Sequence, residues 1–521
     1  MNEKGDGGGP SAPPWWRRLD PLALAWLVVT VVVWGSRGFS GGLYRDAALY
    51  VYAGQQVAAG NAPYVEVMNR AGPLANLLPG LGVELGRLVG ISDTLGARLV
   101  FFALVALTPA LSYLTARDLL RSRLAGCAAA ATMLGFLVIA KLAANGPESK
   151  LAMVAGLSIT LAVLAQRRWF LAGIATGCAT LVWQPVFFAL GPAAAVLLLL
   201  NGGGWRERAI SALRYAAGGL LTLLVTVAGF ALAGAMEEFV EGFWTANAEY
   251  TEQAPGITRL GPVSVFLRSA YGWGFWLLVM GTLAALALGV AAWWLRRNDP
   301  RRAAGQVMLA VSTLGSLAWS AYAFNRAPDS MFHLPAAALG IGGIVGTLAH
   351  LVRRADSLLP RRLLVGAVAV LTVACTVTVL QENISRRSDK LAHQRAASKV
   401  VFDNLPADAT VFSLEVPEAL ALGERKSISR FVLFGHGMID FVAAETPGGE
   451  EGYINGLIEA APDVVLTPNG KRHRVVRTLL DSYVRVGYGP GWRVFLRGDI
   501  DSETRTRIAD GLVAVRREFT D

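Results

Sequence analysis

Long apolar runs separated by short polar segments dominate the chain. Several of them, such as 273–295 and 361–380, approach the roughly 20 residues that a helix needs to cross the hydrocarbon of a membrane. We count about eleven such runs, at 21–36, 98–116, 123–141, 150–166, 169–184, 186–200, 212–234, 273–295, 304–323, 332–352 and 361–380. A soluble core could bury one helix of this kind, but it would not need so many. The pattern therefore predicts a polytopic α-helical membrane protein.

One further apolar stretch, residues 73–90, is a poor candidate for a span because Pro79, Glu84 and Arg87 interrupt it. We expect it to form short helices that lie along the outer membrane surface. The first outer loop then extends from 37 to 97. It is long beside the tight inner connections, and long loops often carry function.

The character of the chain changes at about residue 385, where polar residues begin to dominate. Short β-like runs predict strands at 410–414, 463–467 and 492–496, and the segments between them predict helices at 450–460 and 471–483. Alternating elements of this kind indicate a small α/β domain. The segment has neither a glycine-rich phosphate loop nor a Cys/His cluster in its sequence.

The distribution of charge predicts the topology. Only 17% of the residues are charged, against about 25% in soluble domains, and the basic ones gather in short clusters between the apolar runs. If the N-terminus is cytoplasmic, the arginine clusters all fall on the inner side, as the positive-inside rule requires. The predicted organisation is a disordered cytoplasmic tail at 1–20, a transmembrane module at 21–384 and an extracytoplasmic α/β domain at 385–521. We therefore expect a multi-pass protein of the plasma membrane.

Two classes of partner are excluded by the same distribution. The net charge of +10 does not indicate nucleic-acid binding, because the basic residues are dispersed among the apolar runs. Cys127, Cys178 and Cys375 lie inside apolar runs without the spacing of metal ligands, where a thiol acts as a small hydrophobic group. We expect no metal site and no other cofactor.

The segment from 46 to 72 carries the first candidate chemistry. Asp46 and Tyr50 are one helical turn apart and therefore share a face, and Gly60 and Pro63 mark the end of that helix. An acidic side chain directly after the first membrane helix could meet a lipid-linked substrate and an aqueous one together. A carboxylate that is simply favoured by the dipole at a helix N-terminus is the alternative reading of Asp46.

Several motifs follow one another in a recognisable order. They are D-x-x-x-Y at 46–50, G-N-A-P-Y at 60–64, N-R-x-G-P-L at 69–74, N-G-P-E at 145–148, a glycine-containing helix at 169–184, the segment N-R-A-P-D-S-M-F-H-L-P at 325–335, and S-I-S-R-F at 427–431. Together they resemble the GT-C membrane glycosyltransferases. Within that superfamily they are similar to the dolichyl-phosphate-mannose mannosyltransferase-like and protein O-mannosyltransferase-like branch, which uses polyprenyl-phosphate sugars.

The resemblance implies a GT-C-like fold and a glycosyltransferase that moves a mannose-like hexose or pentose. The donor would be a polyprenyl-phosphate sugar and the acceptor an extracytoplasmic glycan, lipid or protein. The matching position makes Asp46 the catalytic base, which deprotonates the acceptor hydroxyl in an inverting displacement while the lipid phosphate leaves. The expected substrate-binding residues are Tyr50, Arg70, Asn145, Glu148, Lys150, Arg326 and His333.

Other interpretations of these residues stay open from the sequence. Arg326 could bind lipid headgroups, His333 could be a buried polar residue, and Glu148 with Lys150 could form an ordinary salt bridge. The chain also departs from the family pattern, since Gly72 replaces a proline and Gln184 replaces a frequent lysine. A non-catalytic scaffold of the same fold and a lipid or solute transporter are the alternative functions.

Overall fold

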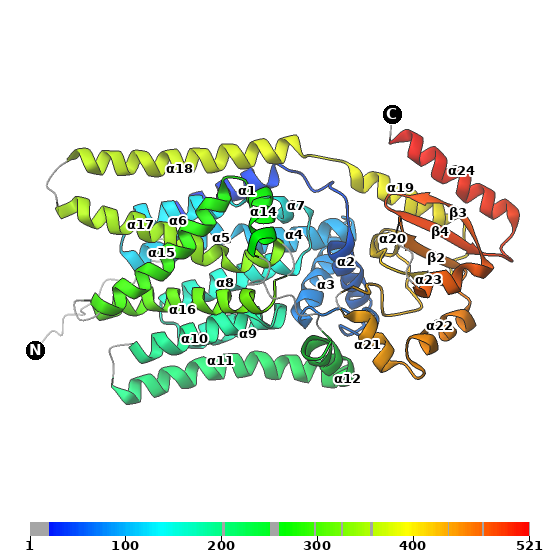
Figure 1. The fold of residues 1–521 in the computed structure, drawn as a ribbon, viewed down its shortest axis with the longest axis horizontal. Helices are drawn as coiled ribbons and strands as arrows, with labels where there is room; N and C mark the ends of the chain where they lie inside the picture. Colours follow the sequence, from blue (N-terminus) through cyan, green and yellow to red (C-terminus); the bar gives the residue numbers. More distant parts are fainter. Residues whose placement is uncertain are drawn as a thin grey trace, which may run out of the picture.

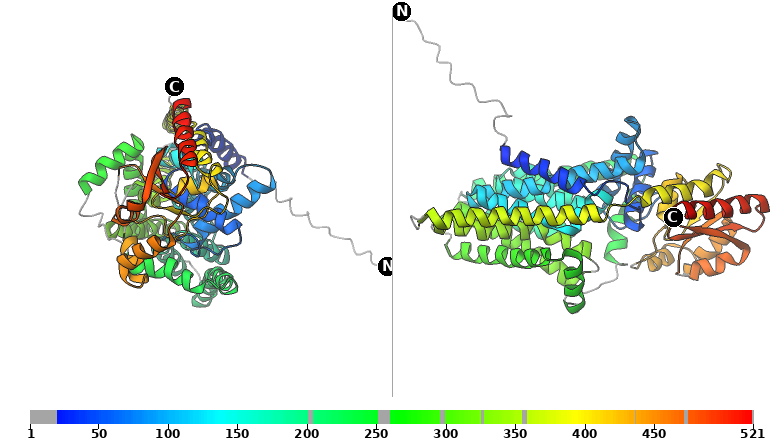
Figure 2. Two further views of the ribbon diagram at one scale, coloured as in Figure 1. Left: turned by 90° about the vertical axis from the view of Figure 1, so that its right-hand side faces the viewer. Right: turned by 90° about the horizontal axis from the view of Figure 1, so that it is seen from above.

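A computed structural model of the chain describes residues 20–200, 204–250, 260–295, 299–324, 327–354, 358–435, 437–470 and 474–519. Figure 1 shows a bundle of long helices with a smaller unit of helices and strands at one end. The helices α2 and α3 lie between the bundle and this unit, and Figure 2 shows the same elongated arrangement from above.

The bundle contains the helices that correspond to the predicted spans. They are α1 Pro21–Gly35, α4 Asp93–Ala106, α5 Thr108–Leu120, α6 Arg123–Gly135, α7 Leu137–Asn145, α8 Ser149–Ala165, α9 Trp169–Val182, α10 Val186–Leu200, α11 Trp205–Leu232, α15 Gly274–Leu295, α16 Pro300–Tyr322, α17 Leu334–Arg354 and α18 Leu358–Ser385. Shorter elements connect them: α12 Met236–Val240, the π-helix η2 Glu241–Thr245, α13 Ala246–Ala248, α14 Leu260–Tyr271 and the 3₁₀ helix η4 Ala327–His333.

Length and composition identify which of these helices could cross a membrane. Five helical stretches of the described chain qualify, namely Asp93–Leu120, Trp205–Leu232, Gly274–Leu295, Pro328–Arg353 and Leu358–Asp403. The pair α6 and α7, bent by 61°, would make a sixth, and α1, α8, α9 and α10 are apolar but shorter. The chain thus has the helices of a polytopic membrane protein, while the number of eleven spans stays a prediction.

Close backbone approach holds parts of the bundle together. A Cβ atom added to Gly281 of α15 would collide with the backbone of Ala337 in α17, and one added to Gly340 would collide with the backbone of Gly281. Small residues at such crossings let membrane helices pack tightly, since dispersion rather than water exclusion holds them together.

The long first outer loop folds into two helices, α2 Arg45–Ala58 and α3 Pro73–Leu88. The prediction of several short helices in 73–90 is wrong, because α3 continues through Pro79 as one helix. Tertiary packing overrides the weak helix propensity here, since Gly82 of α3 lies directly against the backbone of Ala97 in α4.

The start of the chain also differs slightly from the prediction. The predicted tail lies outside the described residues except for Asp20, which caps α1 by accepting a hydrogen bond from the amide of Leu22 at 3.0 Å. Its carboxylate forms an ion pair with Arg117 at 2.6 Å. Asp20 therefore belongs to the folded module.

The C-terminal unit surrounds a mixed β-sheet. Its elements are α19 Lys390–Asp403, β1 Val411–Ser413, α20 Pro417–Gly423, α21 Met438–Glu445, α22 Gly449–Ala460, β2 Val464–Pro468, α23 Arg474–Leu479, the 3₁₀ helix η5 Leu480–Ser482, β3 Tyr483–Gly489, β4 Trp492–Arg497 and α24 Ser502–Glu518. In the described residues the strand order is β1-β2-β4-β3, with β1 and β2 parallel and the other pairs antiparallel. Strands overlap the three predicted ones, and helix α22 overlaps the predicted helix 450–460.

The strand β3 was not predicted, whereas the predicted helix 471–483 is confirmed over most of its described part, since α23 and the 3₁₀ helix η5 together cover 474–482. Helix α23 ends at Leu479, and the chain then becomes strand β3 at Tyr483. A bulge between Arg485 and Gly487 interrupts the alternation of inward and outward side chains in β3, so a period of two is hard to recognise in its sequence.

The C-terminal unit and the first outer loop share one hydrophobic core. Leu43, Leu49 and Tyr52 of the loop are buried in the same cluster as Val411 and Trp492 of the sheet. The amide of Leu43 donates to the side-chain oxygen of Gln394 at 2.7 Å, and the side-chain nitrogen of Gln394 donates to the carbonyl of Leu43 at 2.8 Å. The position of α2 is therefore set from both ends of the chain.

Candidate active site

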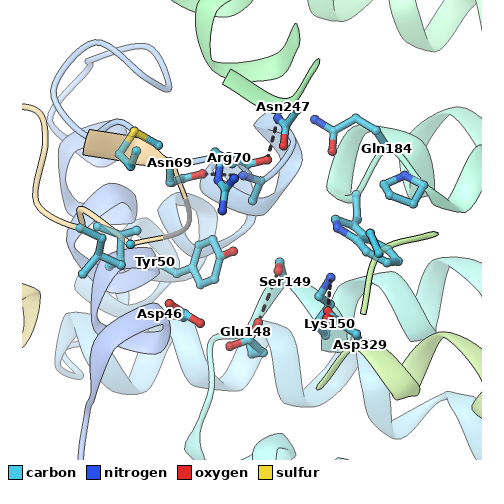
Figure 3. A pocket seen from close by; sticks show the side chains of 18 of the residues that line it. Asp46, Tyr50, Asn69, Arg70, Glu148, Ser149, Lys150, Gln184, Asn247 and Asp329 are labelled. Atoms are coloured by element: carbon cyan, nitrogen blue, oxygen red, sulfur yellow. Dashed lines mark hydrogen bonds and ion pairs between the residues drawn. The ribbon is translucent and has the colours of Figure 1, made fainter. Parts of the chain in front are cut away.

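Helix α2 presents Asp46 and Tyr50 to a cavity. Tyr44 precedes the helix in an extended conformation, so the helix starts at Arg45 and Asp46 lies in its first turn. There the partial positive charge of the helix N-terminus favours a carboxylate. Tyr50, one turn further on, points the same way, as the sequence predicted (Figure 3).

The cavity has a volume of about 360 Å³ and is bounded by segments that are far apart in the sequence. It brings together five of the predicted site residues: Asp46, Tyr50, Arg70, Glu148 and Lys150. Further polar residues line the same space: Asn69, Ser149, Gln184, Asn247 and Asp329. The two carboxylates Asp46 and Glu148 lie next to each other in Figure 3.

Glu148 is the carboxylic acid whose environment disfavours charge. Burial, and then the negative charge of Asp46, raise the pKa of Glu148 well above that of an ordinary glutamate. Burial also raises the pKa of the Tyr50 phenol, and the nearby Glu148 and Asp46 add to this effect. The environment thus favours the protonated forms of Glu148 and Tyr50, in which both can donate hydrogen bonds beside Asp46.

The opposite wall of the cavity carries positive charge. The Nζ atom of Lys150 lies 3.3 Å from a carboxylate oxygen of Asp329 and 3.2 Å from the centre of the Trp183 ring. The alternative interpretation gave Lys150 a salt bridge with Glu148, whereas the ion pair in the structure is with Asp329. Arg70 supplies a second cationic side chain from the loop between α2 and α3.

The loop that carries Arg70 is fixed by side-chain amides. The amide of Ala71 donates to the side-chain oxygen of Asn69 at 3.0 Å, and the Nδ2 atom of Asn69 donates to Asn76 at 2.6 Å. Asn247 donates from its Nδ2 atom to the carbonyl oxygen of Arg70 at 3.1 Å. Asn247 was missed in the sequence, because it follows a run of acidic and aromatic residues that resembles a solvated surface.

Two of the predicted site residues that the structure describes, Asn145 and His333, do not line the cavity. The side chain of Asn145 donates to the carbonyl of Lys141 at 3.1 Å and packs against Gly41, just before α2. Both ring nitrogens of His333 are engaged by serines, Nδ1 with Ser316 at 3.0 Å and Nε2 with Ser320 at 2.8 Å. His333 is thus a buried, hydrogen-bonded polar residue, as the alternative interpretation held. Its hydrogen-bond partners are serine hydroxyl groups. Arg326 lies outside the described residues.

The structure also offers a simple test of the expectation about metals. Among the described residues, no group of three or more His, Cys, Asp or Glu side chains is arranged to hold a metal ion. What the cavity does provide is a pair of neighbouring carboxyl groups, an exposed one on Asp46 and a half-buried one on Glu148, together with two cationic side chains.

Arg98 holds together segments that bound this cavity. The only sign of this role in the sequence is a charged residue within an apolar run. It lies in α4 and is completely buried. Its guanidinium donates to the carbonyl of Gly146 at 2.9 Å, to that of Gly41 at 2.8 Å, and to those of Phe39 and Gly42. Arg98 therefore connects the segment that precedes Asp46 to the segment that precedes Glu148.

Replacing Arg98 with lysine is expected to destabilise the protein by about 3 kcal/mol or more, because an ammonium group cannot reach all of these carbonyls and leaves some buried without a donor. The measurement is the thermal unfolding midpoint of the purified variant. Arg386→Lys, at an exposed ion pair on α18, is the matched control and should change it little. If the two substitutions changed the thermal unfolding midpoint equally, Arg98 would not have the positioning role.

No protein-family model and no curated protein matches the chain. Several solved structures, in contrast, match the chain. ArnT from Cupriavidus metallidurans in the apo state matches with a TM-score of 0.61 and 14% identity over 91% of this chain and 97% of that one. The same protein bound to undecaprenyl phosphate matches with a TM-score of 0.58 and 16% identity over 93% and 98% of the two chains.

An oligosaccharyltransferase from Archaeoglobus fulgidus matches with a TM-score of 0.55 and 13% identity, over 96% of this chain and 78% of that one. These proteins are glycosyltransferases of the GT-C superfamily. The matches extend over nearly the whole of this chain, bundle and C-terminal unit together. The chain is a membrane protein with the fold of the GT-C glycosyltransferases.

Proposed function

We propose that the protein is a membrane glycosyltransferase that uses a polyprenyl-phosphate sugar. The observation that carries this proposal is the cavity itself, which brings Asp46 and Glu148 together with Arg70 and Lys150. A base on one side and cations on the other are what this transfer needs, because an acceptor hydroxyl must lose a proton while a phosphate leaves. The fold supports the choice of donor, since the similar ArnT was solved bound to undecaprenyl phosphate.

In the proposed reaction the acceptor oxygen attacks the anomeric carbon of the donor sugar. The bond between that carbon and the phosphate oxygen breaks, and its electron pair leaves with the polyprenyl phosphate. Asp46 accepts the proton of the acceptor hydroxyl, and the anomeric centre inverts in one step. Arg70 and Lys150 stabilise the charge that develops on the phosphate.

Glu148 and Tyr50 have a supporting role in this proposal. Because the environment of Glu148 favours its protonated form, it adds no second negative charge beside the donor phosphate. As hydrogen-bond donors, Glu148 and Tyr50 can hold sugar hydroxyls next to Asp46. The sugar is a mannose-like hexose or pentose, by resemblance of the sequence motifs.

The C-terminal unit is proposed to cover the cavity on the outer side of the membrane. Leu433, Gly435 and Met438 of this unit contribute to the lining. Ion pairs of Arg430 with Glu241 at 2.8 Å and of Lys426 with Glu66 at 2.6 Å fasten it to the loops of the bundle. In this topology the N-terminus is cytoplasmic, and the acceptor is an extracytoplasmic glycan, lipid or protein.

The direct test uses the full-length protein in lipid nanodiscs with a panel of undecaprenyl-phosphate hexoses and pentoses, each labelled in the sugar. The expected result is conversion of one donor to undecaprenyl phosphate, with the label transferred to material from the cell envelope. A protein that binds these donors but converts none would contradict the proposal and favour a non-catalytic scaffold. Label that moves across the membrane without chemical change would favour a transporter.

A further inference from the structure

A second cavity lies at the end of the helical bundle opposite the proposed active site. It is bounded by the end of α5, the turn between α8 and α9, and the first residues of α11 and α16. Helix α9 connects the two sites, since it begins beside this cavity at Trp169 and ends beside the catalytic cavity at Val182, roughly 20 Å away along its axis.

Arginines from every one of these segments converge on the cavity. They are Arg121, Arg167, Arg206, Arg214, Arg301 and Arg302. Among the described residues that line this space only Asp118 and Glu207 are acidic, and Asp118 is already paired with Arg117 at 2.7 Å. One of the arginines, Arg121, pairs with Asp299 at 3.5 Å. We name this site the arginine cavity. Membrane insertion requires a number of basic residues at one end of a bundle, but it does not require that they share a cavity.

Holding these guanidinium groups together is unfavourable without an anion. Burial, and then the positive charge of Arg301, lower the pKa of Arg167 in the turn between α8 and α9. The Nε atom of Arg302 is buried and has no hydrogen-bond partner among the described residues. Both observations point to a negatively charged ligand with several oxygen acceptors.

A neighbouring cavity indicates what else the ligand carries. It shares Arg121 and Arg302 with the arginine cavity and extends between α15, α16 and α17. Its walls include Leu288, Ala291 and Leu295, so it reaches about two helical turns into the bundle, or roughly 10 Å. This slot also has polar lining residues, among them Asp299, Gln306 and His350, and its apolar part beside a cluster of arginines fits a lipid chain below an anionic headgroup.

We infer that the arginine cavity and the adjoining slot bind one anionic phospholipid, with its phosphate among the arginines and an acyl chain in the slot. This site is separate from the donor site and does not depend on the proposed function. It would bind phosphatidylglycerol or cardiolipin in preference to a zwitterionic lipid, since a phosphodiester without a compensating ammonium group complements a cavity in which arginines outnumber carboxylates.

The test measures lipid retention by the full-length protein after purification in detergent. The delipidated protein is mixed with cardiolipin, phosphatidylglycerol, phosphatidylcholine or inorganic phosphate, and bound lipid is counted by native mass spectrometry alongside the thermal midpoint. Retention of one cardiolipin or phosphatidylglycerol, with a raised midpoint, is expected. Equal stabilisation by inorganic phosphate would show a simple anion site, and equal retention of phosphatidylcholine would show no headgroup recognition. Either result would overturn the proposal.

Matched variants locate the site. Arg206→Gln/Arg301→Gln removes two exposed arginines of the cavity and should lower the affinity for cardiolipin roughly 30-fold. Arg361→Gln/Arg362→Gln removes two exposed arginines from the first turn of α18, which are not among the described residues of either cavity, and should leave it nearly unchanged. Equal losses in both variants would mean that only total charge matters, which would reject the site. If the first variant fails to fold, the comparison of the three lipids and inorganic phosphate on the natural protein tests the proposal by itself.

Discussion

Asp46→Asn is expected to lower turnover by about 10²–10⁴-fold, the usual contribution of a general base, while the protein keeps its fold. The change is nearly isosteric and removes only the negative charge and the ability to accept a proton. Asp46 lies in the first turn of α2, beside Glu148, in a cavity that Arg70 and Lys150 complete. The loss should therefore appear in kcat for a polyprenyl-phosphate sugar and much less in donor affinity.

Asp93→Asn is the control for this variant, because Asp93 belongs to the same region but is not among the described residues that line the cavity. Its carboxylate pairs with Arg87 at 2.9 Å and accepts a hydrogen bond from Gln55 at 3.1 Å. The control should lose some stability and keep its turnover per folded molecule. Near-normal turnover of Asp46→Asn would make Asp46 a simple helix-end carboxylate, and the base would then be sought at Glu148 or Glu66.

Removing the positive charge of Lys150 is expected to raise KM for the donor roughly 10–100-fold, since a charge-assisted hydrogen bond to phosphate is lost. Lys150→Met alone would leave the half-buried carboxylate of Asp329 without the lysine that neutralises it, which could unfold the site. The informative variant is therefore Lys150→Met/Asp329→Asn, in which both charges disappear together. Initial rates against donor concentration separate KM from kcat.

A matched control for the double variant exists on α19. Lys399 and Asp403 also form a lysine–aspartate pair, at 3.9 Å, but they are exposed and far from the cavity in the sequence and in the fold. Lys399→Met/Asp403→Asn should leave both kinetic constants nearly unchanged, because exposed pairs contribute little. An unaltered donor KM in the Lys150 double variant would remove Lys150 from the phosphate site.

Local patterns in the sequence were sufficient for part of the candidate site. Asp46 and Tyr50 share a helical face by their spacing, Arg70 and Glu148 lie in short motifs whose order resembles a known superfamily, and Lys150 follows the motif of Glu148 by two residues; all five line one cavity. The helices of the bundle were predictable for a similar reason, because most of them correspond to a continuous apolar run in the sequence. In both cases the informative residues are neighbours in the chain.

What the sequence could not provide are partners that are distant in the chain. Asn247 holds the carbonyl of Arg70 across 177 positions, and Arg98 connects to Gly146 across 48. His333 is a residue type that often serves in active sites, yet both of its ring nitrogens are hydrogen-bonded to Ser316 and Ser320. The spacing of these residues along the chain did not indicate that contact. Packing decides such contacts, and packing is not visible in a local pattern.

The shared core of the first outer loop and the C-terminal unit has a consequence for biosynthesis. Leu43 is made early, but its two hydrogen bonds are formed with Gln394, 351 positions later. At typical rates of synthesis the loop waits roughly 20–70 s for this partner. The helix that carries Asp46 thus cannot complete its packing until nearly the whole chain has been made and delivered to the same side of the membrane. A prematurely terminated chain would insert most of its helices and still lack the assembled loop that carries Asp46.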